Sequence, residues 1–523
     1  MVNPGRRPST HGNPLPQTMT HLLQQLQAFF TASHCRAYLV GGCLRDSLLG
    51  LSTRDVDLAV EGDALFLARR LADSLGGAFV ALGEEHQVAR IVLRPPGEGE
   101  WRIDLASLRG SLEEDLGYRD FTLDALALPL EYGGVQGWET RLTDPFGGRG
   151  DLEQRRVRAV SDRVFQEDPL RLLRAVRVAA QRGLSIEEAT LALIRRHAPL
   201  LPTVAAERVR DEFLGILAAE GVREHLGLLD SLGLLCRVLP ELEVTRGVSQ
   251  PKEHYWDVFE HSLEAAGAAE RVTGGDRRDP VVATVPWDQR LSQHFAQEVS
   301  DGHTRRTLLK LAALLHDVAK PQTKTVDEKG RTRFFGHQAQ GAAITREVLE
   351  RLRLSGRGVH LVGTMVEYHL RPVQMSQGGE LATSRAVYRY FRDLGDAAVE
   401  TLYLSLADYL AARGPNLELE DWGAYVRMMA HILSTGLEEQ APERRPKLLS
   451  GHDLIQLFGL APGPELGQLL EALREAQAAG EVATQEEALA WVRRQLGRRG
   501  QKPAAKGALR SGRAMERKVY TEG

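Results

Sequence analysis

The hydrophobic pattern of the chain changes near residue 150, and this change constrains the fold more than any other feature. Before it, runs with a period of two, such as residues 55–60, alternate with helical patterns. After it, apolar residues recur at helical spacing and strand patterns almost vanish. Long runs of Leu, Ala, Arg and Glu agree with this, because these residues lose little rotamer freedom in a helix. The sequence therefore predicts an α+β fold, a mixed N-terminal sheet with helices followed by an all-α part.

The expected elements follow from apolar spacing and from turn and capping residues. Asp63 is expected to cap a helix that ends near Leu75. The stretch 274–286 is rich in Gly, Pro and Asp and is expected to be an inserted loop. Helices are predicted over residues 21–33, 43 onward, 63–75, 169–182, 185–195, 206–219 and about 307–495, and strands over 37–40, 55–60, 78–82, 88–93 and 101–105.

Charge is distributed unevenly along the chain. The 66 basic and 70 acidic residues give a formal charge of -4, which does not indicate a general affinity for nucleic acid. Residues 496–523 carry eight Lys or Arg against two Glu and have little apolar periodicity. We expect a disordered basic tail there, which either binds RNA phosphates or only keeps the chain in solution.

Three cysteines, Cys35, Cys43 and Cys236, form no CxxC pair, which is typical of the reducing cytoplasm. The apolar stretches are far shorter than the roughly 20 residues that cross a bilayer. The first 20 residues lack the apolar core of a secretion signal. The sequence therefore predicts a cytoplasmic protein with no membrane partner, and leaves the oligomeric state open.

Two carboxylates after a glycine pair form the sharpest chemical signal. Gly41 and Gly42 let backbone N–H groups approach a phosphate, and Arg45 adds positive charge. Asp55 and Asp57 share one strand face and can hold Mg²⁺ together with substrate phosphates. This equipment suits nucleotidyl transfer with two metal ions. Taken singly, the glycine pair also fits an ordinary turn, and the Asp pair also fits a solvated face.

The order of these motifs resembles a known family. The runs LVGGCLRD (residues 39–46) and TRDVDL (53–58) are similar to the class II tRNA CCA-adding nucleotidyltransferases and bacterial poly(A) polymerases, in the DNA polymerase β superfamily. RDFTLDA (119–125), DPFGG (144–148) and EDPLRLLRAVR (167–177) match later motifs of that family, and the likeness extends to about Glu212. The resemblance implies a nucleotidyltransferase head followed by a helical neck.

The resemblance also implies roles for individual residues. Arg119 and Asp120 would contact the nucleotide sugar, whereas Tyr118 and Asp124 depart from the family pattern and carry no role over. Asp168 and Arg171 would read the nucleobase, since a carboxylate and a guanidinium three apart on one helical face can bond a base edge; a surface salt bridge is the alternative. Three more candidates are Arg174 and Arg177, which continue the nucleotide-binding motif, and Asp104, either a third metal carboxylate or a structural residue.

A second constellation lies in the helical part. His316 and Asp317 end an apolar run, where two polar residues are costly to bury unless they bind something. With His261 upstream and Asp408 downstream, their order resembles the HD phosphohydrolase superfamily, and His337 and His369 are further candidate ligands. Such ligands suit a transition metal, namely Mn, Ni, Co, Fe or Zn. The resemblance implies a phosphohydrolase, although such a domain can also persist as an RNA-holding scaffold.

Together these patterns predict a template-independent RNA nucleotidyltransferase that adds CCA, or part of it, to tRNA 3′ ends from CTP and ATP, with a second phosphohydrolase activity. The alternatives are a partial CC- or A-adding enzyme, a poly(A) polymerase, or mainly an HD phosphohydrolase with an RNA-binding head. The predicted segments are a flexible N-terminus (1–20), the nucleotidyltransferase head (21–150), the neck (151–225), the HD-type body (226–413), a helical C-terminal region (414–495) and the tail (496–523).

Overall fold

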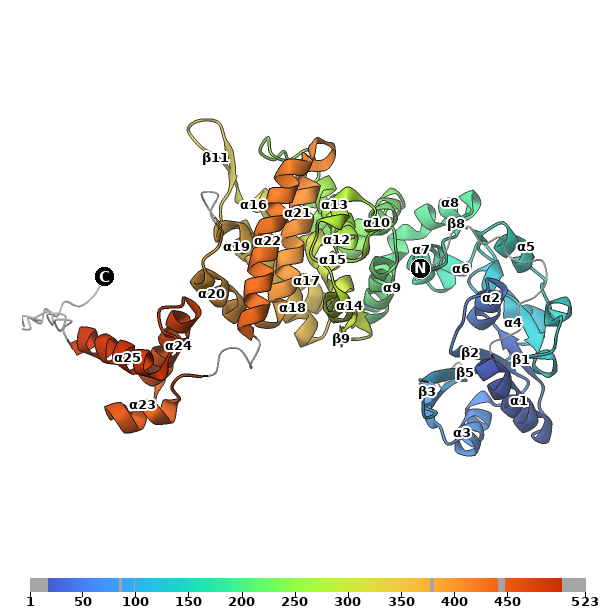
Figure 1. The fold of residues 1–523 in the computed structure, drawn as a ribbon. Helices are drawn as coiled ribbons and strands as arrows, with labels where there is room; N and C mark the ends of the chain where they lie inside the picture. Colours follow the sequence, from blue (N-terminus) through green and yellow to red (C-terminus); the bar gives the residue numbers. More distant parts are fainter. Residues whose placement is uncertain (1–16, 84–86, 98, 377–380, 441–446, 501–523) are drawn as a thin grey trace, which may run out of the picture. The chain divides into compact units, whose positions relative to one another are not determined.

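The computed structural model describes residues 17–83, 87–97, 99–376, 381–440 and 447–500 (Figure 1). The chain divides into two compact units, residues 1–370 with 396–426 and residues 371–395 with 427–523. Within the described ranges, no helix combines the length and the apolar character needed to span a membrane.

The first unit begins with a mixed sheet, which has six strands in the described part of the chain, in the order β3-β4-β5-β2-β1-β6. β2 and β5 run parallel, and every other neighbouring pair is antiparallel. The parallel pairing sets Asp57 beside Asp104. The strands are β1 (Ala37–Val40), β2 (Asp55–Val60), β3 (Ala78–Gly83), β4 (Val88–Leu93), β5 (Trp101–Ser107) and β6 (Ala127–Pro129).

The strand and helix predictions for the head are confirmed. Val56, Leu58 and Val60 are buried, as the period of two in β2 requires. The Asp63 side chain accepts a hydrogen bond from the Phe66 amide and caps α3, as its type and position indicated. The helices of the head are α1 (Gln17–Ala32), α2 (Gly42–Leu48), α3 (Ala64–Leu75), α4 (Leu112–Gly117) and α5 (Gly148–Glu153).

The neck is helical, with one correction. The predicted helix over 185–195 begins at Glu188, because Ser185 and Ile186 pair with Arg156 and Val157 in a two-stranded ribbon, β7 with β8. Strands of two residues are too short to show a period, so the sequence pattern could not reveal them. The helices here are α6 (Val164–Glu167), α7 (Arg171–Arg182), α8 (Glu188–His197), α9 (Ala206–Ala218), α10 (Val222–Ser231) and α11 (Leu235–Val238).

The body that follows packs α12 (Val258–Gly274) against α15 (Arg305–Leu315) and α21 (Ala398–Arg413). The inserted stretch contains one short helix, α13 (Pro280–Ala283). The helices predicted from residue 307 are interrupted by a hairpin of β11 (Lys324–Val326) and β12 (Thr332–Phe334). The remaining elements are α14 (Gln289–Ala296), β9 (Glu298–Ser300), β10 (His303–Thr304), α16 (Lys320–Thr323), α17 (His337–Arg351), α18 (Gly356–Tyr368) and α22 (Leu419–Gln440).

The second unit has its own apolar core, in which Leu454, Leu473 and Trp491 pack together. Its helix α25 extends to Gly500, so the first five residues of the predicted disordered tail are helical. Residues 501–523 lie outside the described residues, as do residues 1–16 of the predicted flexible N-terminus. The helices of this unit include α19 (Arg371–Gln374), α20 (Ser384–Leu394), α23 (Gly451–Phe458), α24 (Pro464–Ala478) and α25 (Gln485–Gly500).

Candidate active site

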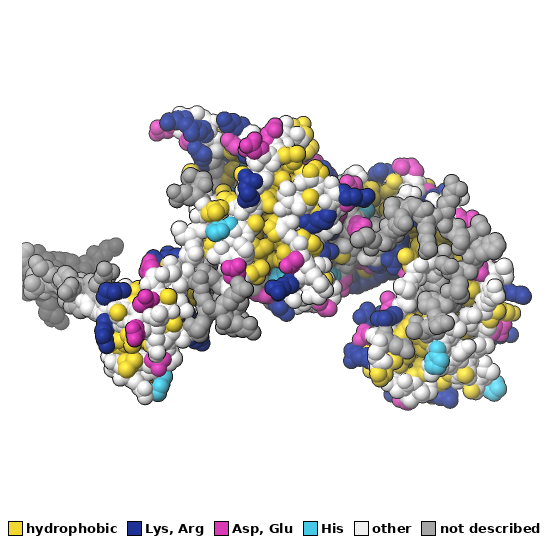
Figure 2. Space-filling view, in the orientation of Figure 1, with side chains coloured by type: hydrophobic (Ala, Val, Ile, Leu, Met, Phe, Trp, Pro, Cys, Tyr) yellow, Lys and Arg dark blue, Asp and Glu magenta, His cyan; other side chains and the backbone are white. Residues whose placement is uncertain are grey.

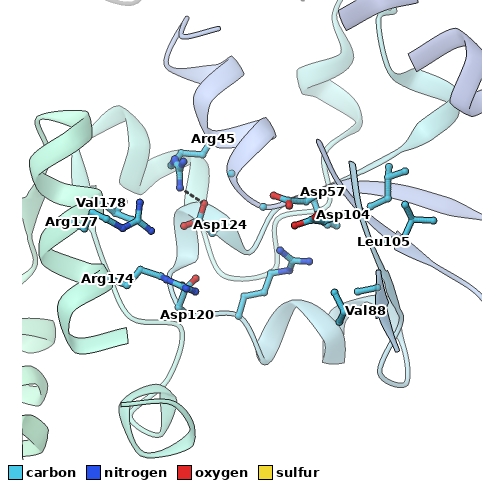
Figure 3. A pocket seen from close by; sticks show the side chains of 16 residues that line it. Arg45, Asp57, Val88, Asp104, Leu105, Asp120, Asp124, Arg174, Arg177 and Val178 are labelled. Carbon is cyan, nitrogen blue, oxygen red and sulfur yellow. Dashed lines mark hydrogen bonds and ion pairs between the residues drawn. The ribbon is translucent and has the colours of Figure 1, made fainter. Parts of the chain in front are cut away.

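A cavity of about 330 Å³ lies where the head sheet faces helix α7 of the neck (Figure 3). Side chains from β1, β2, β5 and α7 converge on it. Nine of the residues predicted from the sequence line this cavity: Gly41, Gly42, Arg45, Asp57, Asp104, Arg119, Asp120, Arg174 and Arg177.

The carboxylates of Asp57 and Asp104 lie on neighbouring strands and both face the cavity. Burial and the nearby charges of Asp104, Asp124 and Asp55 raise the pKa of Asp57 to about 6, although Arg119 opposes the rise. Asp104 is held by two hydrogen bonds of 2.8 Å from Arg90. Asp55, two residues earlier on the same strand face, is exposed and lies outside the cavity lining.

Mutual repulsion among these carboxylates indicates that the site binds a cation. Like charges in a partly buried place raise one another's pKa and are relieved when a cation binds between them. Oxygen ligands from one or two carboxylates, with the rest from phosphates and water, are the arrangement that Mg²⁺ prefers. The residues present therefore fit a divalent cation beside Asp57, in the first half of β2.

Gly41 lies in the turn between β1 and α2 and faces the cavity. Its φ is +71°, and a Cβ there would lie 2.8 Å from the Arg119 Nη1 atom and 3.0 Å from the Asp57 Oδ2 atom. A side chain at this position would therefore both strain the backbone and displace two site residues. Glycine is required at position 41 because the side chains of Asp57 and Arg119 approach its backbone closely.

Arginines supply the positive charge of the cavity, and two of them, Arg119 and Arg45, differ in how many of their N–H groups are already hydrogen-bonded. Arg119 has a buried Nε atom with no hydrogen-bond partner, so it can donate to an anion placed in the cavity. Arg45 instead donates to Asp46 at 2.9 Å and to Asp124 at 2.7 Å. Its charge is shared between two carboxylates, which reduces what it offers a triphosphate.

Asp124 is a cavity residue to which the sequence analysis gave no role. Its carboxylate is buried, and burial raises its pKa to about 6 against the attraction of Arg45. The only sequence signal was its departure from the family pattern, where Asn is usual. In this chain the position provides the acidic partner of Arg45.

Glu212 on α9 is a second residue that sequence reasoning missed. It is buried and accepts hydrogen bonds from Arg174 at 3.1 Å and from Arg177 at 2.5 Å. Arg174 also lies 3.4 Å from the Asp120 carboxylate. A buried acid on a helix with apolar neighbours such as Phe213 was the available signal, because such a group needs a partner.

The structure corrects the placement of the base-reading pair. Helix α7 begins at Arg171, so Asp168 precedes the helix and does not share a helical face with Arg171. Asp168 bonds Arg208 of α9 at 2.8 Å, and Arg171 donates to the Tyr118 carbonyl at 2.7 Å. Arg171 lines a second hollow of about 230 Å³, which shares Arg119 with the first cavity, whereas Asp168 lines neither.

The raised pKa of Asp57 predicts a stability effect. A carboxyl whose folded pKa lies above its unfolded value of 3.8 costs the folded state free energy as pH rises from about 4 to 6, and that cost is fully present above pH 6. In EDTA at pH 7.5, Asp57→Asn should therefore melt about 5 °C higher than wild type. Mg²⁺ should raise the melting temperature of wild type and not that of the variant. Asp73→Asn, at an exposed position on α3, should respond as wild type does.

The second predicted constellation forms a cluster inside the helical body. The Nε2 atoms of His261 and His316 lie 3.2 Å apart, and each is near Asp408 Oδ1, at 3.1 Å and 3.5 Å. The Nε2 atoms of His337 and His369 lie 3.4 Å apart. All six predicted ligands therefore come together from α12, α15, α17, α18 and α21 and the residues that flank these helices.

Asp317 lies between the two histidine pairs. Its Oδ2 atom is 3.4 Å from His261 Nε2 and 3.2 Å from His316 Nε2, and its Oδ1 atom is 3.5 Å from His337 Nε2. Both oxygens are buried; Oδ1 has no hydrogen-bond partner among the described residues, whereas Oδ2 is paired with Lys320 Nζ at 2.5 Å. Burial raises the pKa of Asp317, but the nearby His316 and Lys320 outweigh it and hold that pKa well below its usual value. The carboxylate is thus ionised, and its Oδ1 atom is available to a cation.

The histidines are oriented as metal ligands. The Nδ1 atoms of His316, His337 and His369 each lie 2.7 Å from a backbone carbonyl, to which they donate. In His337 and His369, whose pKa values are lowered by burial, this leaves the Nε2 lone pair facing the cluster, the usual arrangement around a bound metal. Burial also lowers the pKa of His316, but the carboxylates of Asp317 and Asp408 outweigh it and raise that pKa to about 10, so the His316 Nε2 atom must lose a proton before it binds a metal. Burial lowers the pKa of His369 to about 3, so its ring is neutral at physiological pH.

Two neighbours of this cluster were not predicted. His254 groups with His261 and Asp408, and burial lowers its pKa to about 4. Lys320 Nζ lies 2.5 Å from Asp317 Oδ2. Both residues lie close to motif residues, yet only the packing of the loop before α12 shows that His254 faces the cluster.

Comparisons with known proteins match each part of the chain. The poly(A) polymerase head domain matches residues 37–158, and an RNA- and SrmB-binding region of polymerase A matches residues 183–245. The HD domain matches residues 258–413. The model of tRNA nucleotidyltransferase domain 2 matches residues 443–492.

Whole-chain relatives are similar over most of their length. An A-adding tRNA nucleotidyltransferase of Deinococcus radiodurans is 38% identical over 88% of this chain and 95% of its own. A CC-adding tRNA nucleotidyltransferase of Thermus thermophilus is 34% identical over 87% and 93%. The fold resembles that of a Thermotoga maritima CCA-adding enzyme complexed with tRNA, with a TM-score of 0.59 and 21% identity over 92% and 97%. The chain belongs to the tRNA nucleotidyltransferase family and carries an HD domain.

Proposed function

We propose that this chain is an enzyme that adds nucleotides of the CCA sequence to the 3′ end of tRNA, from CTP and ATP. The cavity beside Asp57 is the main support for this proposal. It is lined by the carboxylates of Asp57 and Asp104 on neighbouring strands, by the glycine turn at Gly41 and by Arg119, whose Nε atom has no hydrogen-bond partner. Relatives that are 38% and 34% identical are named as tRNA nucleotidyltransferases. In this proposal the head comprises residues 21–150, the neck residues 151–225 and the HD-type body residues 226–413.

In the proposed reaction, the 3′ hydroxyl oxygen of the RNA bonds to the α-phosphorus of the nucleotide as the bond to pyrophosphate breaks. The carboxylates of Asp55, Asp57 and Asp104 would hold Mg²⁺. Arg90 orients the Asp104 carboxylate through two hydrogen bonds. The ion would neutralise triphosphate charge and lower the pKa of the hydroxyl. The turn at Gly41 leaves room for the phosphates, and Arg119 Nε donates to them.

Addition of only part of CCA is a second candidate, favoured by the names of the relatives, which are an A-adding and a CC-adding enzyme. Three tRNA transcripts, ending before CCA, after the first C, or after CC, separate these possibilities when each is given CTP alone, ATP alone or both nucleotides. Extension of all three to CCA with both nucleotides supports full addition. Extension of only the transcript that ends in CC, with ATP, supports an A-adding enzyme.

Base choice should depend on Arg171, which lines the hollow beside the cavity. Asp168 is paired with Arg208 and would have to leave this partner to accept a hydrogen bond from a base beside Arg171. A guanidinium donor and a carboxylate acceptor would then suit the ring nitrogen and exocyclic amine of C or A, and would meet the carbonyls of U and G with the wrong polarity. Wild type should use CTP or ATP in preference to UTP and GTP by about 10- to 100-fold. Arg171→Ala should shrink this ratio in single-nucleotide incorporation assays, and Arg195→Ala on α8 should not. If Arg171→Ala leaves the preference for CTP or ATP over UTP and GTP unaltered, Arg171 does not read the base.

We propose a second activity for the HD cluster, hydrolysis of a phosphoester at an RNA end, such as a 2′,3′-cyclic phosphate. Four inward-facing imidazoles and two carboxylates favour a transition metal over Mg²⁺. Such an ion supplies an activated water, whose oxygen bonds to phosphorus while one ester oxygen leaves with a proton. The convergence of the Nε2 atoms on Asp317 is the observation that supports this activity over a scaffold role.

A further inference from the structure

The β11–β12 hairpin, residues 324–335, projects from the helical body beside the HD cluster (Figure 1). Its second strand ends at that cluster. The Phe334 carbonyl accepts a hydrogen bond from His337 Nδ1 at 2.7 Å. Lys320 Nζ lies 5.4 Å from the centre of the Phe334 ring while it pairs with Asp317. The base of the hairpin is therefore hydrogen-bonded to His337 of the cluster and in contact with Lys320, the ion-pair partner of Asp317.

Phe335, the next residue, is unusually exposed. Its side chain is 81% exposed, the largest fraction for a big hydrophobic side chain in the described part of the chain. Two positions later is His337, a member of the cluster. Single exposed apolar side chains are common on protein surfaces, so the position of this ring, two residues before a histidine of the cluster, is what favours a role in contact with a ligand.

The hairpin is also basic. It carries Lys324, Lys329, Arg331 and Arg333 against two acidic residues, and Figure 2 shows Lys and Arg side chains gathered over it. Asp327 is occupied within its own turn, where it accepts hydrogen bonds from the amides of Lys329 and Arg331. The side chains of Lys329 and Arg331 are exposed and have no ion-pair partner among the described residues. Glu328 in the same turn is also exposed, so residues 327–331 carry two basic and two acidic side chains, and the excess of two positive charges belongs to the hairpin as a whole.

Exposed aromatic and basic side chains on one arm have a specific use. Bases stack on aromatic faces while Lys and Arg neutralise the phosphates, which is how proteins hold single strands without reading their sequence. An acidic peptide would use the charge and leave Phe335 without a stacking partner. A small phosphoester would reach the cluster without touching the tip.

We propose that the β11–β12 hairpin binds the single-stranded 3′ end of an RNA and guides it to the HD cluster, with a base stacked on Phe335 and phosphates on Lys329 and Arg331. This inference rests on the proposed hydrolysis at the HD cluster and names its substrate as a strand rather than a mononucleotide. The hairpin is a positioning element and takes no part in the chemistry.

Hydrolysis by the full-length, metal-loaded chain tests the proposal with two substrates, a ten-nucleotide RNA ending in a 2′,3′-cyclic phosphate and the corresponding cyclic mononucleotide. Phe335→Ala should lower kcat/KM for the RNA by about 5- to 100-fold, mainly through KM, and leave the mononucleotide unchanged. Phe335→Tyr should keep wild-type values because it retains the ring. Equal losses on both substrates, or none on the RNA, would overturn the proposal.

The charge contribution has its own measurement. The double variant Lys329→Gln with Arg331→Gln should reduce the slope of log kcat/KM against log salt by about 1.4 for the RNA, since each phosphate contact to a single strand contributes about 0.7. Arg290→Gln, exposed on α14, is the matched control and should leave the slope unchanged. A slope that is the same in the double variant and in wild type would contradict a phosphate contact.

Crosslinking separates failure of this inference from failure of the proposed hydrolysis. The same RNA with 4-thiouridine next to its end is irradiated with the protein, and crosslinked peptides are identified by mass spectrometry. Crosslinks within residues 324–337 support the hairpin as a binding arm even if no phosphoester is hydrolysed. Crosslinks confined to the head and neck overturn it even if hydrolysis occurs.

Discussion

Asp57→Ala should abolish nucleotide incorporation into tRNA while the protein stays folded. The side chain faces the cavity beside Asp104, and its loss removes a ligand from the ion that would neutralise the transition-state charge. We expect a fall of at least about 1000-fold in single-turnover rate, and a similar fall for Asp55→Ala.

The control for this pair is Asp73→Ala, which removes an exposed carboxylate from α3 of the same head. It should incorporate nucleotides at the wild-type rate. Circular dichroism and tRNA binding show whether each variant is folded. Retention of more than about a tenth of wild-type turnover by Asp57→Ala at saturating Mg²⁺ would remove this carboxylate from the catalytic machinery.

Asp317→Ala should eliminate phosphoester hydrolysis and bound transition metal while nucleotide addition continues. This carboxylate lies within 3.5 Å of three histidine Nε2 atoms, so its loss affects both histidine pairs at once. Metal content by mass spectrometry and hydrolysis across a panel of phosphoesters are the two measurements. We expect hydrolysis to fall at least about 1000-fold.

His316→Ala should have the same effect as Asp317→Ala, and His360→Ala, exposed on α18, should have none. Because removal of a buried charge can also unfold the body, circular dichroism and thermal melting of each variant report whether the body is folded, and retained nucleotide addition reports that the head is intact. Wild-type protein that binds no transition metal and hydrolyses no phosphoester would reduce the HD body to a scaffold.

Much of the head could be predicted from local pattern. The period of two in residues 55–60, the glycine pair and the Asp63 cap are short-range signals, and each corresponds to a feature of the structure. The facing of Asp57 and Asp104 depended on strand order, which an alternating pattern does not specify. Nine of the predicted residues line one cavity, whereas Asp55, Asp168 and Arg171 do not.

The missed features share a physical reason. Glu212 and His254 matter through partners 35 and 7 residues away in sequence, so only tertiary packing reveals them. Asp168 was placed on a helix face because helical spacing does not show which residue begins the helix. The β11–β12 hairpin was missed because its strands have three residues each and all of β11 is exposed, which leaves no alternation to detect.

A crystal structure of this chain with Mg²⁺ and a CTP or ATP analogue whose α–β bridge cannot be cleaved tests the proposed active site most directly. We expect an ion between Asp55 and Asp57, the triphosphate over Gly41 within hydrogen-bond distance of Arg119 Nε, and the base beside Arg171. A nucleotide bound elsewhere, with the Asp57 carboxylate uncoordinated, would contradict the proposed active site.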